Sequence, residues 1–234
     1  DMLKTKGLVH KLNGFISFVD PDVVEQVPMT LRDSLQQKLD LLVSAKDTAQ
    51  LAATIGREFS YELLIAVSNK NESQIQQDLN ELIDSEIVYL QRKVTSDSYI
   101  FKHALVRDAA YESLRTANRT TLHLNIAQVL ERRSGEYLPL VAHHYQQANE
   151  YEIALKLWIQ IADAHKKSAL HVEAVSNYEK GLMLIDKIAD EAKTFAAEIT
   201  IRSALAISFS ATIGYANELA VHDRATQRCN LGIR

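Results

Sequence analysis

The sequence predicts a mostly α-helical fold, and three observations favour it. The chain of 234 residues contains only seven glycines and three prolines, the residues that most often break helix interiors and mark turns. Apolar residues recur at helical spacing over most of the chain from residue 30 onward. Only two short regions have the character of β-strands. We therefore expect helices with a small β-hairpin, followed by helices alone.

Composition and charge place the chain among ordinary soluble domains. The net charge of −4 and the isoelectric point near 6.1 give no general electrostatic reason to bind nucleic acid. The single cysteine, Cys229, excludes an internal disulfide and suits a reducing compartment. No apolar run approaches the roughly 20 residues of a membrane span, and no signal peptide opens the chain. We expect a cytoplasmic protein with no membrane partner.

Residues 1–29 predict the end of a preceding domain and a connector. The chain begins at Asp1 instead of a methionine, which we interpret as a boundary within a longer protein. The pair Asn13-Gly14 separates two β-forming runs, Leu8–Leu12 and Phe15–Val19. Such a pair is a strong hairpin signal because both turn positions need a positive φ.

Residues 30–86 predict four helices, most of them opened by a capping residue. Thr30 and Ser44 each have an aspartate three residues later, which is a capping signature. Gly56 ends the second helix, and Ser60 can cap the short third one. The expected ranges are about 30–42, 45–55, 61–67 and 73–85.

A β-hairpin and a closing helix follow. Ile87–Leu90 and Ser98–Phe101 are rich in β-forming residues and are separated by polar residues. A helix from about His103 to Leu114 comes next. Helices, then a hairpin, then one helix, within about 85 residues, is the order expected of a winged-helix module. We assign residues 30–117 to a winged-helix domain.

Residues 118–234 predict helices only, arranged as tetratricopeptide-like repeats in an α-solenoid. In such repeats large residues fill the space between helices, and small ones let two helices approach closely. An upstream segment, 138–145, repeats the spacing of the first helix. The residues that reproduce the repeat spacing are Trp158, Ile161, Ala162 and His165 on one helix and Ala174, Tyr178 and Gly181 on the next.

One segment carries a family resemblance. Phe101–Glu112 resembles the last winged-helix segment of STAND-class signalling ATPases, in which Met-His-Asp is often followed by Leu-Val-Arg-Asp. His103 is kept, whereas Lys102 and Ala104 replace the Met and the Asp. Further segments are similar to the region behind the ATPase module in bacterial class III adenylate cyclase–ATPase fusion proteins. These segments are Val27–Leu35, Ile55–Leu64, Ala142–Tyr145 and Gly214–Ala216.

The resemblance implies a regulatory fragment without a catalytic residue. Residues 1–29 would end the ATPase lid, and the upstream ATPase module of the same chain would be a partner. His103 would contact the phosphate of ADP in the intact parent, where ATP or ADP binds with Mg²⁺. This chain has no Gly-x-x-x-x-Gly-Lys-Ser/Thr phosphate loop, so we expect no cofactor in the fragment itself. The alternative is that His103 only caps the helix or is partly buried at its junction.

Three functions remain open. The first is a sensor in which the winged helix couples the nucleotide state to repeats that bind a protein or a small ligand. The second is a peptide-binding tetratricopeptide scaffold without nucleotide switching. The third is a DNA-binding transcriptional regulator. The candidate recognition helix, Glu72–Glu86, contains acidic residues but no Lys or Arg. Such a surface repels phosphate, which disfavours the third function.

The other histidines predict no metal site. His143 and His144 are adjacent, so on a helix their side chains point about 100° apart. The remaining histidines, His123, His165, His171 and His222, lack a framework of cysteines or paired carboxylates. We interpret them as scattered polar residues. No Gly-x-Ser-x-Gly nucleophile motif occurs either.

Overall fold

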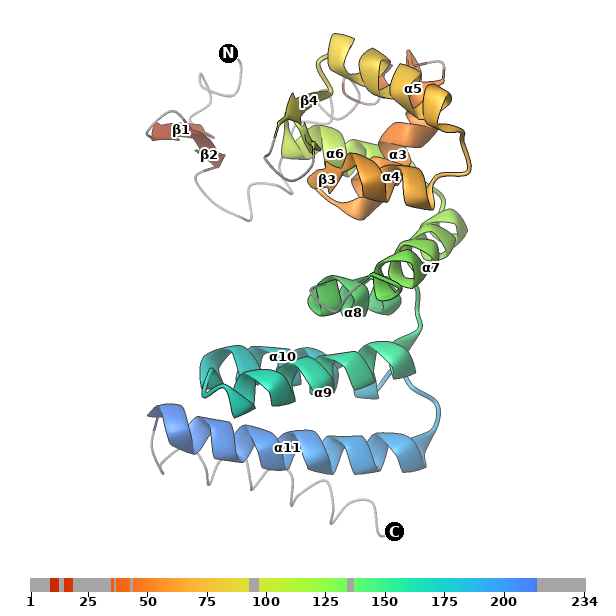
Figure 1. Ribbon diagram of the computed structural model, residues 1–234. Helices are drawn as coiled ribbons and strands as arrows, with labels where there is room; N and C mark the ends of the chain where they lie inside the picture. The colour runs from red at the N-terminus through yellow and green to blue at the C-terminus, as the bar shows by residue number, and fades with distance from the viewer. Residues whose placement is uncertain are drawn as a thin grey trace. The chain divides into compact units, whose positions relative to one another are not determined.

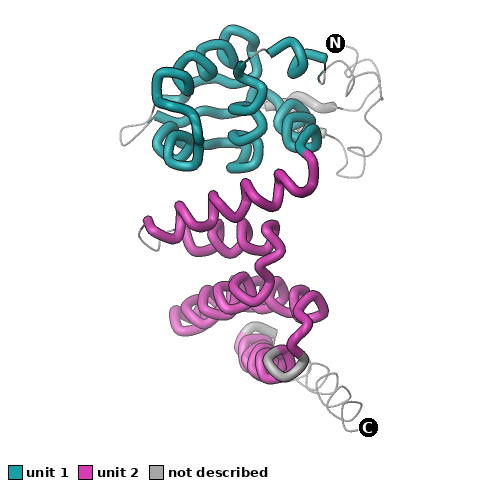
Figure 2. Tube along the Cα trace, turned by 90° about the vertical axis from the view of Figure 1, so that its right-hand side faces the viewer, with its two compact units in different colours: residues 1–114 teal, residues 115–234 magenta. Residues whose placement is uncertain are grey.

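The computed structural model of the chain describes residues 9–12, 15–18, 35, 37–42, 44–92, 97–133 and 137–213. In these residues the fold is mostly α-helical with small antiparallel sheets, as the sequence predicts (Figure 1). The chain divides into two compact units, Asp1–Leu114 and Arg115–Arg234 (Figure 2). The boundary predicted from the sequence lies three residues later, after residue 117.

The N-terminal hairpin has the two predicted strands. β1 (Val9–Leu12) pairs antiparallel with β2 (Phe15–Phe18), and Leu12 lies opposite Phe15. The pair Asn13-Gly14 and the rest of the predicted lid and connector lie outside the described residues. Of the helix predicted at 30–42, residues 35 and 37–40 are described as helical.

The next three helices of the first unit lie close to their predicted ranges, although Ser44, the predicted cap of α3 (Ala45–Ile55), makes no side-chain cap hydrogen bond. α3 ends at Gly56. α4 (Tyr61–Val67) begins after Ser60, whose hydroxyl accepts a hydrogen bond from the Leu63 N–H at 3.2 Å. α5 (Glu72–Asp84) begins one residue earlier than predicted because Asn71 and Gln74 form a reciprocal capping box.

The sheet of the first unit has one strand more than the sequence predicts. β4 (Val88–Gln91) and β5 (Ser98–Phe101) form the expected hairpin, and α6 (Ala104–Glu112) follows. A third strand, β3 (Glu58–Ser60), pairs with β5, so that the order is β3-β5-β4. The Phe59 and Tyr99 rings stack across this pairing, with centroids 5.7 Å apart.

The second unit consists of helices that pack in chain order. Each helix contacts the next one along the chain (Figure 2). No strand occurs among its described residues, and the predictions for Gly214–Ala216, His222 and Cys229 fall outside them. The helices are α7 (Thr116–Glu131), α8 (Leu138–Gln147), α9 (Tyr151–Lys167), α10 (His171–Ile185) and α11 (Glu191–Ile213).

Three of these helices meet at Gly181. A Cβ atom at this position would lie 3.3 Å from Ile201 Cδ1 on α11 and 3.4 Å from Leu155 Cδ1 on α9. Trp158 is 4% exposed, as predicted, and its Cβ lies 3.9 Å from the same point. The Trp158 indole N–H donates to Gln146 Oε1 on α8 at 3.1 Å. Trp158 therefore ties α8 to the pair of helices that follows.

No helix of the described part of the chain is long and apolar enough to cross a membrane.

Replacement of Trp158 by alanine should destabilise residues 138–188 by about 3–5 kcal/mol, because a buried Trp leaves a cavity that cannot fully collapse. Stacked helices depend mainly on their neighbours, so residues 44–114 should keep their stability. Hydrogen exchange on the whole chain measures the stability of both ranges of residues. Val172→Ala is the control, since Val172 on α10 is 70% exposed. Equal loss of protection in both units would contradict the division into two units.

Candidate functional site

His103 lies at the junction between β5 and α6. It is the N-cap residue, with extended backbone angles of −134° and 138°, and its side chain makes no cap hydrogen bond. The carbonyl oxygen of His103 instead accepts from the Val106 and Arg107 N–H groups, at 3.1 and 3.3 Å. The imidazole is exposed. The side-chain cap weighed in the sequence analysis is therefore absent, and the ring faces solvent.

Arg107 holds α6, and with it the His103 junction, against α3. Its Nε donates to the Ala53 carbonyl at 3.2 Å, and its Nη1 pairs with Asp108 Oδ1 at 2.8 Å. The guanidinium also lies over the Tyr111 ring, 5.5 Å from its centre. These contacts give Arg107 a positioning role that the sequence analysis missed, because Ala53 lies 54 residues away in the chain.

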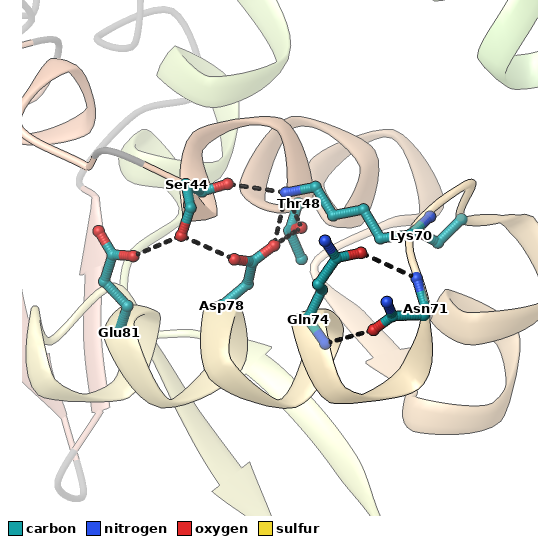
Figure 3. Close-up of polar contacts among 8 residues, drawn as sticks. Ser44, Thr48, Lys70, Asn71, Gln74, Asp78 and Glu81 are labelled. Atoms are coloured by element: carbon teal, nitrogen blue, oxygen red, sulfur yellow. Dashed lines mark hydrogen bonds and ion pairs between the residues drawn. The ribbon is translucent and has the colours of Figure 1, made fainter.

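A buried polar network joins α3, α5 and the loop between α4 and α5 (Figure 3). Asp78 on α5 is 2% exposed. Its carboxylate accepts from Ser44 Oγ at 2.9 Å, Thr48 Oγ1 at 2.5 Å and Lys70 Nζ at 2.6 Å. Lys70 Nζ also donates to the Ser44 carbonyl at 2.7 Å. Both charges are thus satisfied by oxygen or nitrogen partners.

The balance of these contacts lowers the pKa of Asp78. Burial raises the pKa, but hydrogen bonds from Lys70, Thr48 and Ser44 favour the charged form more strongly and outweigh it. A carboxylate that is fully paired and covered has little freedom to act as a base on a ligand. We interpret the network as a structural lock between helices, and the sequence analysis did not predict it.

The exposed face of α5 is polar and acidic. Its exposed residues are Glu72, Ser73, Gln74, Gln76, Gln77, Asn80 and Asp84. The nearest lysine, Lys70, has its ammonium bound by Asp78 and Ser44. Phosphate contacts need available Lys or Arg side chains, and this face offers none.

A cluster of three histidines lies between α7 and α8. His123 and His144 are 3% and 1% exposed, and their Nδ1 atoms lie 2.8 Å apart. The ring of His143 is 5.6 Å from that of His144, centre to centre. The prediction of scattered histidines is wrong for these three. Their proximity depends on how two helices pack, which chain spacing does not reveal.

Burial acts strongly on this cluster. Burial and, to a smaller extent, the neighbouring His123 and His143 together lower the pKa of His144 to about 3. Within the residues that the structure describes, no group of three or more His, Cys, Asp or Glu side chains is arranged to hold a metal ion. Elsewhere, Asn177 Nδ2 lies 3.1 Å from the Nδ1 of His165, which joins α10 to α9.

No protein-family model matches the chain. The chain is similar to an uncharacterized protein of Rhizobium meliloti (strain 1021), with 22% identity over 191 residues. This alignment covers 80% of the chain and 19% of the other protein. The chain therefore spans about a fifth of the length of this relative.

Replacement of Lys70 by methionine should destabilise α3 and α5 by about 3 kcal/mol at pH 7, because it leaves the Asp78 carboxylate buried without its counter-ion. Since the pKa of Asp78 is lowered, this contribution is full above its unfolded value near 3.8 and is lost as the pH falls below it. Protection from hydrogen exchange measures the loss.

The matched control is Lys46→Met, because Lys46 pairs with Asp40 at 2.5 Å at the surface. An exposed ion pair contributes about 0–1 kcal/mol. If the two substitutions reduce stability equally, the buried network contributes no more stability than the exposed ion pair.

Proposed function

We propose that this chain is the regulatory and sensor part of a STAND-type signalling ATPase of the kind fused to adenylate cyclases. In this proposal the first unit is a winged-helix module that couples the nucleotide state of an upstream ATPase module to the second unit. The second unit forms tetratricopeptide-like repeats that bind a protein or a small ligand. The chain itself has no catalytic role.

The single observation that carries the proposal is the placement of His103. Its imidazole is exposed at the start of α6, without a cap hydrogen bond. Arg107 fixes α6 to α3, so the ring projects from an anchored helix. A neutral or charged imidazole on a fixed support can donate to a phosphate oxygen of a nucleotide bound elsewhere in the parent.

The arrangement of the first unit supports the winged-helix part of the proposal. Helices α3, α4 and α5 precede the β4–β5 hairpin, and the short β3 completes a three-stranded antiparallel sheet. Winged-helix modules have this order of elements. The exposed face of α5 is acidic and would repel the phosphates of DNA. This favours a packing role for the face over a DNA-binding one.

The second unit supports the repeat part of the proposal. Its helices pack in chain order with buried small residues where they touch, as in a solenoid. Large apolar side chains remain exposed on α11 and near both ends of α10, where an apolar part of a ligand could bind. These side chains are Leu170, Val172, Met183, Phe195, Ile199 and Ile207.

The isolated chain should show no appreciable affinity for ATP or ADP. It lacks a phosphate loop, and a lone imidazole supplies one donor where nucleotide sites bring several together. Isothermal titration calorimetry with each nucleotide and Mg²⁺ tests this. Micromolar affinity of the isolated chain would refute the assignment of the nucleotide site to an upstream module.

In the full-length parent, His103→Ala should weaken ADP binding by about 1.5–3 kcal/mol, the usual range for a hydrogen bond to a charged group. The parent should then shift toward its active form. ADP dissociation rate and output activity are the two measurements.

The matched control is Lys102→Ala in the same parent. Lys102 is the exposed neighbour of His103 and pairs with Glu86 at 3.0 Å, so its loss leaves the junction in place. If His103→Ala releases ADP no faster than this control, His103 does not contact the nucleotide.

A further inference from the structure

The His123–His144 contact has room for one proton between its two nitrogens. The Nδ1 atoms are 2.8 Å apart, which is a hydrogen-bond distance. One imidazole must donate its Nδ1–H, and the other must offer the Nδ1 lone pair. If both rings carry a proton on Nδ1, two N–H groups point at each other and the bond is lost. The doubly protonated pair is therefore incompatible with this geometry.

A single extra proton is also unfavourable on His144. The Nδ1 atom of His144 is hydrogen-bonded to His123. Protonation of His144 therefore gives a charged ring with an N–H group at Nε2. The Nε2 atom of His144 is buried and has no hydrogen-bond partner in the described part of the chain. A charged ring there would be desolvated without compensation, which costs far more than a buried neutral group.

Among the described residues, no carboxylate is one of the groups that shift the pKa of His144. The groups that act on His144 are two other imidazoles, His123 from α7 and His143 from α8 itself. Glu131 of α7 accepts from the Tyr145 hydroxyl at 2.6 Å, so this carboxylate is already engaged at the same pair of helices. From α9, the Trp158 indole N–H makes a hydrogen bond with the neutral Gln146 side chain on α8. Glu150, between α8 and α9, acts on Tyr145.

We propose that the buried His123–His144 pair makes the α7–α8 contact an acid-sensitive joint. The contact is closed near pH 7.5, where both imidazoles are neutral. Acid opens it because opening lets both rings take up protons in water. α7 is the first helix of the second unit, so the joint lies where the chain passes from the first unit into the stacked helices. This inference concerns the chain alone and does not depend on the proposed function.

The linkage between proton binding and opening gives the direction and size of the pH effect on the α7–α8 contact. An imidazole that is neutral when closed and has an ordinary pKa near 6.5 when open stabilises the closed form above about pH 6.5. That stability is lost progressively as the pH falls below this value. Between pH 7.5 and 5.5 the opening constant should rise about tenfold for each such imidazole, and about a hundredfold when both contribute.

Hydrogen exchange of the whole chain at pH 7.5 and 5.5, corrected for the intrinsic pH dependence of exchange, tests the proposal. The opening constants of α7 and α8 should rise about ten- to a hundredfold in wild type, and those of α10 much less. In His123→Gln and His144→Gln the rise should shrink about tenfold, since a glutamine does not titrate in this range. His165→Gln is the control, because His165 is hydrogen-bonded on α9 and outside the cluster.

A direct measurement keeps the proposal testable when a variant folds poorly. Imidazole ¹⁵N chemical shifts of the wild-type chain report the protonation and tautomer of each ring. His144 should stay neutral in the folded chain at pH 5.5. Titration of His144 near pH 6.5 with unchanged protection of α7 and α8 would overturn the acid-sensitive joint.

Discussion

Close packing of helices at alanine and glycine residues is the constraint on which both units depend. In the first unit, α5 and α6 pack against α3, where Ala45, Ala49 and Ala52 are fully buried. In the second unit, Gly181 lets α9 and α11 approach α10 within van der Waals contact. Larger side chains at these points would separate the helices, and the interactions that depend on their spacing would be lost. The Asp78 network, which joins α3 to α5, needs that spacing.

Local signals in the sequence predict most of the elements. The bounds of α3 and α4 follow from Gly56 and Ser60, because caps and helix stops act within a few residues. The β4–β5 hairpin follows from two β-forming runs around a polar turn. β3 is missed because a strand of three residues carries almost no periodicity, and its pairing with β5 spans about 40 residues. Local propensity cannot indicate such a partner.

The polar clusters could not be predicted for a related reason. His123 and His144 are 21 residues apart, and their contact requires α7 and α8 to face each other with one particular rotation about their axes. The sequence shows each histidine only as a polar residue on a helix. Asp78 presents the same difficulty, since it looks like part of the acidic surface of α5. Only packing shows that it points inward to Thr48 and Lys70. His103 differs because a motif marks it independently of packing.

The Asp78–Lys70 pair also bears on what the first unit can bind. A buried ion pair seldom adds stability beyond that of apolar residues of similar volume, but its partners must meet for either charge to be tolerated. The pair therefore fixes one arrangement of α3 against α5. In doing so it engages the ammonium of Lys70, whose side chain is 27% exposed, shortly before the start of α5. The exposed face of α5 is then left with acidic and neutral groups, so that the interactions open to it are with cationic or uncharged surfaces. This electrostatic character suits the packing role that we propose for the face.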